Sequence, residues 1–203
     1  VTHDLRTPLA VVRGSIELIA AAARDGKPEA AEHWVREALG QVDRIDRTID
    51  SIVASLRVLR GEATVLAATP LDIVVDETVG MLAPVLRRHQ LVASFAIRPL
   101  VASASAELLR RLLEYLLENA AKYAPGDVSV AIEPGPDAIR VVVRDSGPGI
   151  PKEIEGRLFQ TFVTAGKKGG TGLGLAIVKK IAEEHEGSVS VRSSAAGAQF
   201  EIR

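Results

Sequence analysis

Between positions 42 and 59, hydrophobic residues recur at alternating steps of three and four. The run contains Val42, Ile45, Ile49, Ile52, Leu56 and Leu59. This spacing places one continuous seam along a helix and is typical of coiled coils. The segment therefore predicts a long helix that needs a partner for its seam.

A shorter helix is predicted before it, from Thr2 to Arg24, followed by a helix stop and turn at 25–28. The apolar residues at helical spacing there are Leu5, Leu9, Val12, Ile16 and Ile19. Two helices joined by a short loop pack antiparallel, but such a hairpin cannot cover its own apolar stripe. We expect two copies to form a homodimeric four-helix bundle. The alternative is that the seam packs on the rest of the same chain.

The second part of the chain is expected to be a separate globular domain. At 203 residues the chain exceeds the usual domain length of about 100 to 150 residues. The segment from Gly61 to Pro70 is rich in small residues and ends in Thr-Pro, as in a linker or the approach to an edge strand. We therefore expect a helical domain over 1–62 and a globular domain over 63–203.

An α+β fold is predicted for this second domain. Strands are expected over 71–75 and 91–97, and helices over 76–89, 106–123 and 173–185. Two antiparallel hairpins are expected, with strands at 128–132 and 139–144 and at 189–191 and 199–202. Since the chain has only four Phe, two Tyr and one Trp, its core must consist of Leu, Val, Ile and Ala.

Composition excludes several classes of function. The 25 basic and 26 acidic residues include no basic block of the kind that binds nucleic acid or a membrane surface. The absence of cysteine excludes disulfides, thiolate zinc sites and cysteine nucleophiles. No apolar run approaches the roughly 18 residues that span a bilayer. We expect this chain to be soluble and, because it begins without Met, to be preceded by further segments.

Near the start of the chain, His3 and Thr7 share a helix face beside Asp4. A neutral imidazole can attack phosphorus through one nitrogen when a carboxylate accepts the hydrogen bond of the other nitrogen. Pro8 removes a backbone hydrogen bond and should loosen the turn that carries His3. The alternative is a solvated His–Asp pair at a fraying helix end.

Two further blocks of sequence suggest a nucleotide-binding site. Asn119 and Lys122 share a helix face, where an amide oxygen can ligate Mg²⁺ and a lysine can offset phosphate charge, although such residues are usually surface residues. Asp145, with Gly147 and Gly149 after it, could accept an adenine amino group beside a closely approaching backbone. The same sequence is also an ordinary turn.

A glycine-rich stretch, 169–175, opens a predicted helix, so its backbone N–H groups could face phosphate. It lacks the ending of a Walker loop, and a flexible loop is the alternative. Lys167 and Lys168 lie just before it and could also meet phosphate. Phe159 and Phe162 precede this segment and could anchor a hinge or pack in the core.

Together these blocks resemble, in order and spacing, the sensor histidine kinases of two-component systems over essentially the whole chain. Residues 3–9 look like the H-box, 118–123 like the N-box, 145–149 and 170–175 like the two Gly boxes, and 159–162 like the F-box. The resemblance implies a dimerisation and histidine phosphotransfer hairpin followed by a catalytic Bergerat-type ATP-binding domain. That fold is shared with gyrase, a heat-shock chaperone and mismatch-repair ATPases.

The resemblance also implies residue roles. His3 would be the phosphoacceptor, Asp4 its base, Asn119 the Mg²⁺ ligand, Lys122 a phosphate contact and Asp145 the adenine acceptor. The other residues assigned to the ATP site are Tyr123, Gly147, Gly149, Phe159, Lys167, Lys168, Gly170, Thr171, Gly172, Leu173, Gly174 and Leu175.

The partners implied are a second copy and a response regulator, whose aspartate receives the phosphoryl group. Thr7 matches the position that similar proteins use to dephosphorylate this partner. The fragment would be cytoplasmic, with the full-length protein anchored at the bacterial inner membrane by segments outside this chain.

One position departs from the family pattern. The family often has a second Asn one helical turn before the Mg²⁺ ligand, and here that position is Tyr115. Two alternatives stay open. The first is an ATPase clamp, against which the H-box and the lack of a Glu base at 115 argue. The second is a dimeric scaffold whose nucleotide site has decayed.

Overall fold

The computed structural model describes residues 2–60, 64–84, 86, 89–136, 138–164 and 172–203. Within these ranges, the chain divides between Arg57 and Val58 into a helical unit and a mixed α and β unit. The predicted boundary at residues 62 and 63 falls on positions outside the described ranges and stays a prediction.

The helical unit is the predicted hairpin, formed by α1 (Thr2–Arg24) and α2 (Pro28–Leu59). Gly26 ends α1 with a φ of +67°, a left-handed conformation that glycine adopts without strain. The N–H of Lys27 donates to the carbonyl of Ala22 at 2.9 Å, which is the hydrogen bond of a Schellman motif. The turn at 25–28 is therefore confirmed as a helix stop.

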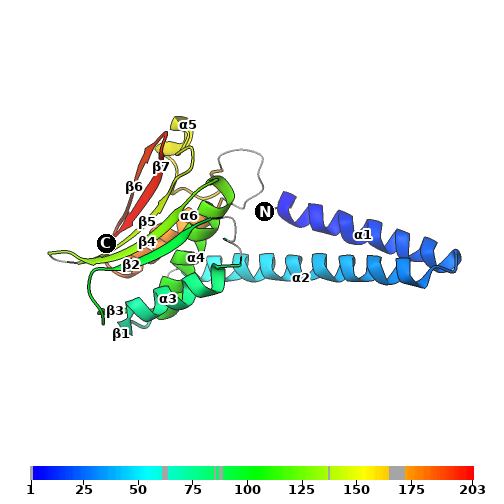
Figure 1. Ribbon diagram of the computed structural model, residues 1–203, viewed down its shortest axis with the longest axis horizontal. Coiled ribbons are helices and arrows are strands. Elements are labelled where there is room, and N and C mark those ends of the chain that lie inside the picture. Colours follow the sequence, from blue (N-terminus) through cyan, green and yellow to red (C-terminus); the bar gives the residue numbers. More distant parts are fainter. Residues whose placement is uncertain (1, 61–63, 85, 87–88, 137, 165–171) are drawn as a thin grey trace. The chain divides into compact units, whose positions relative to one another are not determined.

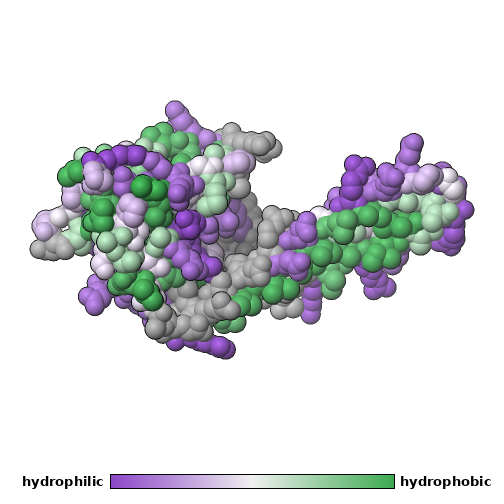
Figure 2. All heavy atoms as spheres, turned by 90° about the horizontal axis from the view of Figure 1, so that it is seen from below, coloured by the Kyte–Doolittle hydropathy of each residue, from purple (hydrophilic) through white to green (hydrophobic). Residues whose placement is uncertain are grey.

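An apolar stripe runs along the surface of this hairpin (Figure 2). Leu9, Ile16 and Leu39 are each more than half exposed, at 60, 58 and 59%. Val42, Ile49 and Leu56 of the predicted seam are also exposed. Within the part of the chain that the structure describes, no helix is both long enough and apolar enough to cross a membrane.

The second unit is built on a sheet with the strand order β2-β4-β5-β7-β6 (Figure 1). Its strands are β2 (Leu91–Phe95), β4 (Val128–Pro134), β5 (Ile139–Asp145), β6 (Val189–Ser194) and β7 (Gly197–Ile202). Both predicted hairpins are present as antiparallel pairs, β4 with β5 and β6 with β7. Strand β2 pairs with β4 in parallel, so the sheet is mixed.

Helices α3 (Leu71–Leu82), α4 (Ala106–Tyr123) and α6 (Gly174–Glu184) lie on one side of this sheet (Figure 1). The N-cap of α4 is Ser105, whose hydroxyl accepts a hydrogen bond from the N–H of Leu108 at 3.4 Å. Apolar residues from these helices and the sheet form the core, including Val75, Leu113, Leu117, Val130, Ile132, Val143 and Ile177. The predicted aliphatic core and the α+β class are confirmed.

The prediction for residues 71–89 is wrong. The segment 71–75 is not a strand but the start of α3, which ends at Leu82 rather than at residue 89. Leu71, Val74, Val75 and Thr78 are buried at helical spacing, so burial on one helix face outweighs the strand preference of the β-branched residues. The strand of this region is β1 (Ala67–Pro70), directly before α3.

Two short elements were not predicted. Strand β3 (Val101–Ala104) pairs with β1 in a separate two-stranded sheet. The hydroxyl of Thr69 in β1 donates to the carbonyl of Ala104 at 2.7 Å, which ties the two strands together. Helix α5 (Lys152–Glu155) follows the first glycine block. Both elements are too short to show a periodic pattern.

Candidate nucleotide-binding site

The last turns of α4 carry the predicted metal and phosphate residues. Asn119 and Lys122 are half-buried there, one turn apart. The ammonium nitrogen of Lys122 lies 5.1 Å from the centroid of the Tyr123 ring. Partial desolvation, reinforced by the negative charge of Glu114, raises the pKa of the exposed neighbour Glu118 above its ordinary value, although Lys122 acts in the opposite direction. The carboxylate of Glu118 is therefore less favoured here than in water.

Asp145 ends β5, and its carboxylate is held by the backbone. Its Oδ1 accepts hydrogen bonds from the N–H groups of Gly147 at 2.9 Å and Ala198 at 3.3 Å. Strand β7 approaches so closely that a Cβ on Gly197 would collide with the carbonyl oxygen of Asp145. Among the described residues, Oδ2 has no hydrogen-bond partner. One carboxylate oxygen is thus fixed, and the other can accept a hydrogen bond from a ligand.

The turn after Asp145 packs against the end of α4. A Cβ on Gly147 would lie 3.1 Å from both the Cα and the Cβ of Ala124, the residue that caps α4. Only a glycine allows this approach without a shift of backbone. The turn that follows Asp145 therefore lies against the C-terminal end of α4, the helix that carries Asn119.

Gly149 is held against the β6–β7 hairpin. Its φ is +76°, and a Cβ there would collide with the carbonyl oxygen of Ser194. The next N–H, that of Ile150, donates to the hydroxyl of Ser193 at 2.6 Å. The loop that follows Asp145 is therefore fixed at both ends, by α4 and by β6.

The second glycine block begins with a closed backbone contact. The N–H of Phe162 donates to the carbonyl of Gly172 at 2.8 Å, and Gly172 has a φ of +66°. Leu173 is buried and forms the N-cap of α6, and Gly174 and Leu175 start the helix. Phe159 is half-buried, whereas Phe162 is 68% exposed and so does not pack in the core.

Tyr115 lies on α4 and contacts the start of α6. A Cβ on Gly174 would be 3.0 Å from Cδ1 of Tyr115, so the ring packs on the first residue of α6. The side chain that departs from the family pattern therefore contacts the second glycine block directly.

Most of the remaining predicted residues are outside what the structure describes, and Thr7 is the exception. Lys167, Lys168, Gly170 and Thr171 lie in the gap at 165–171, and the side chains of His3 and Asp4 are not described, although their backbone is part of α1. Thr7 is exposed on α1.

Three contributors to the site were not predicted: Ala198, Gly197 and Ser193, all in the β6–β7 hairpin. Gly197 and Ala198 approach Asp145 because β7 pairs with β5, whereas Ser193 of β6 accepts a hydrogen bond from the loop after Asp145. The only signal in the sequence is the glycine of the hairpin turn, which indicates a close backbone approach without identifying its partner.

Family models match both units. Residues 1–72 match the His Kinase A (phospho-acceptor) domain. Residues 104–203 match the family described as histidine kinase-, DNA gyrase B- and HSP90-like ATPase. The order of these domains on one chain decides the family. The chain belongs to the sensor histidine kinases of two-component systems.

Curated histidine kinases align with the whole chain. The probable sensor histidine kinase TcrY of Mycobacterium tuberculosis is 30% identical over 209 residues, which cover 100% of this chain and 44% of the relative. The signal transduction histidine-protein kinase/phosphatase MprB of Mycolicibacterium paratuberculosis is 32% identical, covering 97% of this chain and 39% of the relative. The chain thus spans less than half the length of these histidine kinases.

Solved histidine kinases share the fold. The Acinetobacter baumannii histidine kinase AdeS has a TM-score of 0.75 and 22% identity, over 98% of this chain and 95% of that one. The histidine kinase ThkA, in complex with the response regulator protein TrrA, has a TM-score of 0.69 and 23% identity, over 99% of this chain and 58% of that one. The predicted hairpin followed by an ATPase-type domain is confirmed.

Proposed function

We propose that this chain is the catalytic core of a dimeric histidine kinase that transfers the γ-phosphoryl group of ATP to His3 and then to an aspartate of a response regulator. The observation that carries the proposal is the carboxylate of Asp145, held through Oδ1 by the N–H groups of Gly147 and Ala198. This arrangement leaves Oδ2 to accept the amino group of adenine.

The phosphates would lie between α4 and the start of α6. The first backbone N–H groups of α6 have no side-chain cap, because Leu173 is the N-cap residue and makes no side-chain capping bond. Such groups favour an anion through their hydrogen bonds and the helix dipole. Lys122 on α4 adds a positive charge. Because α4 packs on α6, the N–H groups of α6 and the ammonium group of Lys122 would contact the same phosphates.

Asn119 is the residue that would hold Mg²⁺. Among the described residues, no group of three or more His, Asp or Glu side chains could hold a metal ion. The donor set fits a hard cation that takes one amide oxygen from the protein and most of its other ligands from phosphates and water. When bound, the cation would neutralise the charge of the triphosphate.

In the transfer step, a nitrogen of the neutral His3 imidazole attacks the γ-phosphorus in line. A P–N bond forms, the P–O bond to the β-phosphate breaks, and ADP leaves. Asp4 would accept a hydrogen bond from the other ring nitrogen, which fixes the tautomer and stabilises the imidazolium that forms. Positioning of the reactants and charge neutralisation would supply most of the rate.

The phosphoryl group would then pass from His3 to the response regulator, as the P–N bond breaks and a P–O bond to its aspartate forms. A phosphatase activity is a second candidate, since Thr7 is exposed four residues after His3. One relative of this chain is itself named a kinase/phosphatase.

The apolar stripe on the hairpin supports a homodimer. We propose that the whole protein is anchored at the bacterial inner membrane through segments beyond this chain.

The test is incubation of the chain and of a His3→Ala variant with Mg²⁺ and γ-labelled ATP. We expect an acid-labile, alkali-stable label on the parent and none on the variant. Equal labelling of both would exclude His3 as the acceptor. An unlabelled parent that still binds ATP would instead support the scaffold alternative, and rapid ATP hydrolysis without label would support the clamp ATPase.

A further inference from the structure

The contact between Tyr115 and Gly174 joins the two helices that flank the proposed phosphate position. Tyr115 is one turn before Asn119 on α4, so both side chains project from the same helix face. Gly174 is the first residue of α6, and a Cβ there would be 3.0 Å from Cδ1, 3.5 Å from Cγ and 3.7 Å from Cβ of Tyr115. The ring therefore lies directly on the backbone of the first turn of α6.

This contact leaves no space for a larger residue at 174 unless the ring moves. The 3.0 Å separation is tighter than ordinary van der Waals contact, and the half-buried ring is held between α4 and α6, which pack on each other. Gly174 lies inside a regular helix and has no positive φ. An alanine would therefore suit the backbone, and among the described residues the three nearest atoms that oppose it all belong to Tyr115.

From this geometry we infer that Tyr115 is a positioning residue that sets the distance between the first turn of α6 and the face of α4 that carries Asn119. This inference rests on the proposed function, because that turn is where the triphosphate would bind. Adenine would be held elsewhere, by Asp145 at the end of β5. Removal of the ring should therefore affect the phosphates and leave recognition of the nucleoside intact.

The experiment compares the affinities of the parent and of Tyr115→Ala for ATP and for adenosine, by titration followed in NMR spectra. We expect Tyr115→Ala to weaken ATP binding by about tenfold while adenosine binding is unchanged. Tyr115→Phe, which keeps the ring, should retain ATP affinity. Equal losses for ATP and adenosine, or no loss for ATP, would overturn the inference. A parent that binds adenosine but not ATP would overturn the proposed function as well.

A second pair of variants tests the contact itself. Gly174→Ala should weaken ATP binding, and the double variant Tyr115→Ala/Gly174→Ala should bind ATP no worse than Tyr115→Ala alone, because the added methyl group then has space. The matched control is Gly80→Ala in α3, where a Cβ would have no neighbour within 4 Å. Independent, additive losses in the double variant would contradict a direct contact between the two positions.

Discussion

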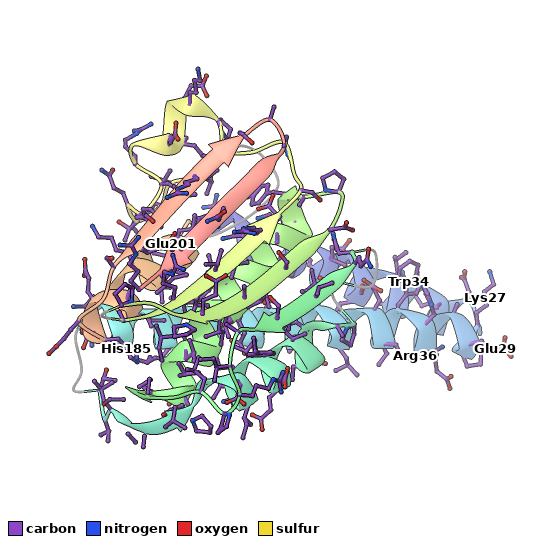
Figure 3. The ribbon with its side chains drawn as sticks, turned by 60° about the vertical axis from the view of Figure 1, so that its left-hand side comes forward. Lys27, Glu29, Trp34, Arg36, His185 and Glu201 are labelled. Carbon is purple, nitrogen blue, oxygen red and sulfur yellow. The ribbon has the colours of Figure 1, made fainter. Side chains whose placement is uncertain are left out.

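The ring of His185 connects the C-terminal end of α6 with the N-terminal end of α4, whereas Tyr115 contacts Gly174 at the other end of α6. Its Nε2 accepts a hydrogen bond from the N–H of Ser105 at 3.0 Å, and its Nδ1 lies 2.8 Å from the carbonyl oxygen of Ile181. Because that carbonyl can only accept, Nδ1 carries the proton and Nε2 the lone pair. Ser105 is the N-cap of α4. His185, which is labelled in Figure 3, is the C-cap of α6.

Replacement of His185 by alanine should destabilise the second unit. The N–H of Ser105, which is partly buried, would lose its acceptor, and we expect a cost near the lower end of the about 1–3 kcal/mol for a buried donor. Native-state hydrogen exchange at the Ser105 amide measures this loss. The control is His33→Ala, since His33 is exposed on α2 and should change stability by less than about 0.5 kcal/mol. Unchanged protection of Ser105 in the His185 variant would show that the bond does not contribute.

Asp145→Asn should weaken ATP binding by at least about tenfold without loss of folding. The two N–H groups that now bind Oδ1 would hold the amide oxygen, so the amide NH₂ would face the adenine amino group, and two donors cannot pair. Isothermal titration calorimetry measures the affinity. The matched control, Asp127→Asn, changes an exposed turn residue and should bind like the parent. Equal affinities for the Asp145 variant and the parent would remove Asp145 from the site.

A charge in the apolar seam should break the proposed dimer. Ile49 is 44% exposed in the described hairpin, and Ile49→Glu would bury two carboxylates in the four-helix bundle. We expect multi-angle light scattering to give a dimer mass for the parent and a monomer mass for the variant. The control is Arg13→Ala, which removes an exposed ion pair with Glu17. A variant that remains dimeric would place the dimer interface elsewhere.

Glu201 should make stability depend on pH. Glu201 lies on β7 (Figure 3). Its hydrogen bond with Arg203, at 2.8 Å, lowers its pKa from the ordinary value of 4.5, and burial opposes this effect while Arg140 and Arg192 add to it. A lowered pKa in the folded state means that the stabilisation is present above pH 4.5 and is lost as the pH falls through the folded-state pKa.

Glu201→Gln should therefore unfold at a lower temperature than the parent at pH 7, and the two melting temperatures should converge in acid. Thermal unfolding followed by circular dichroism at several pH values tests this. A difference in melting temperature that stays constant down to pH 3 would mean that packing of the side chain, rather than its charge, stabilises the sheet.

The sequence determined those features that repeat along one element. The helix from Thr2 to Arg24, the stop at Gly26 and the α4 helix over 106–123 were all predicted within their observed bounds, because helical spacing and capping residues are local signals. The blocks around Asn119, Asp145 and Gly174 were also recognised, since their spacing along the chain indicates the family.

Tertiary structure decided what lies between these elements. Val74 and Val75 prefer strands, but they lie in a helix because they are buried on one helix face. Strand β3 is defined by its pairing with β1, which its own sequence does not indicate. The hydrogen bond from the N–H of Ala198 to Asp145 and the packing of Tyr115 on Gly174 join residues that are distant in the sequence. Such contacts depend on strand pairing and helix packing, which local periodicity does not encode.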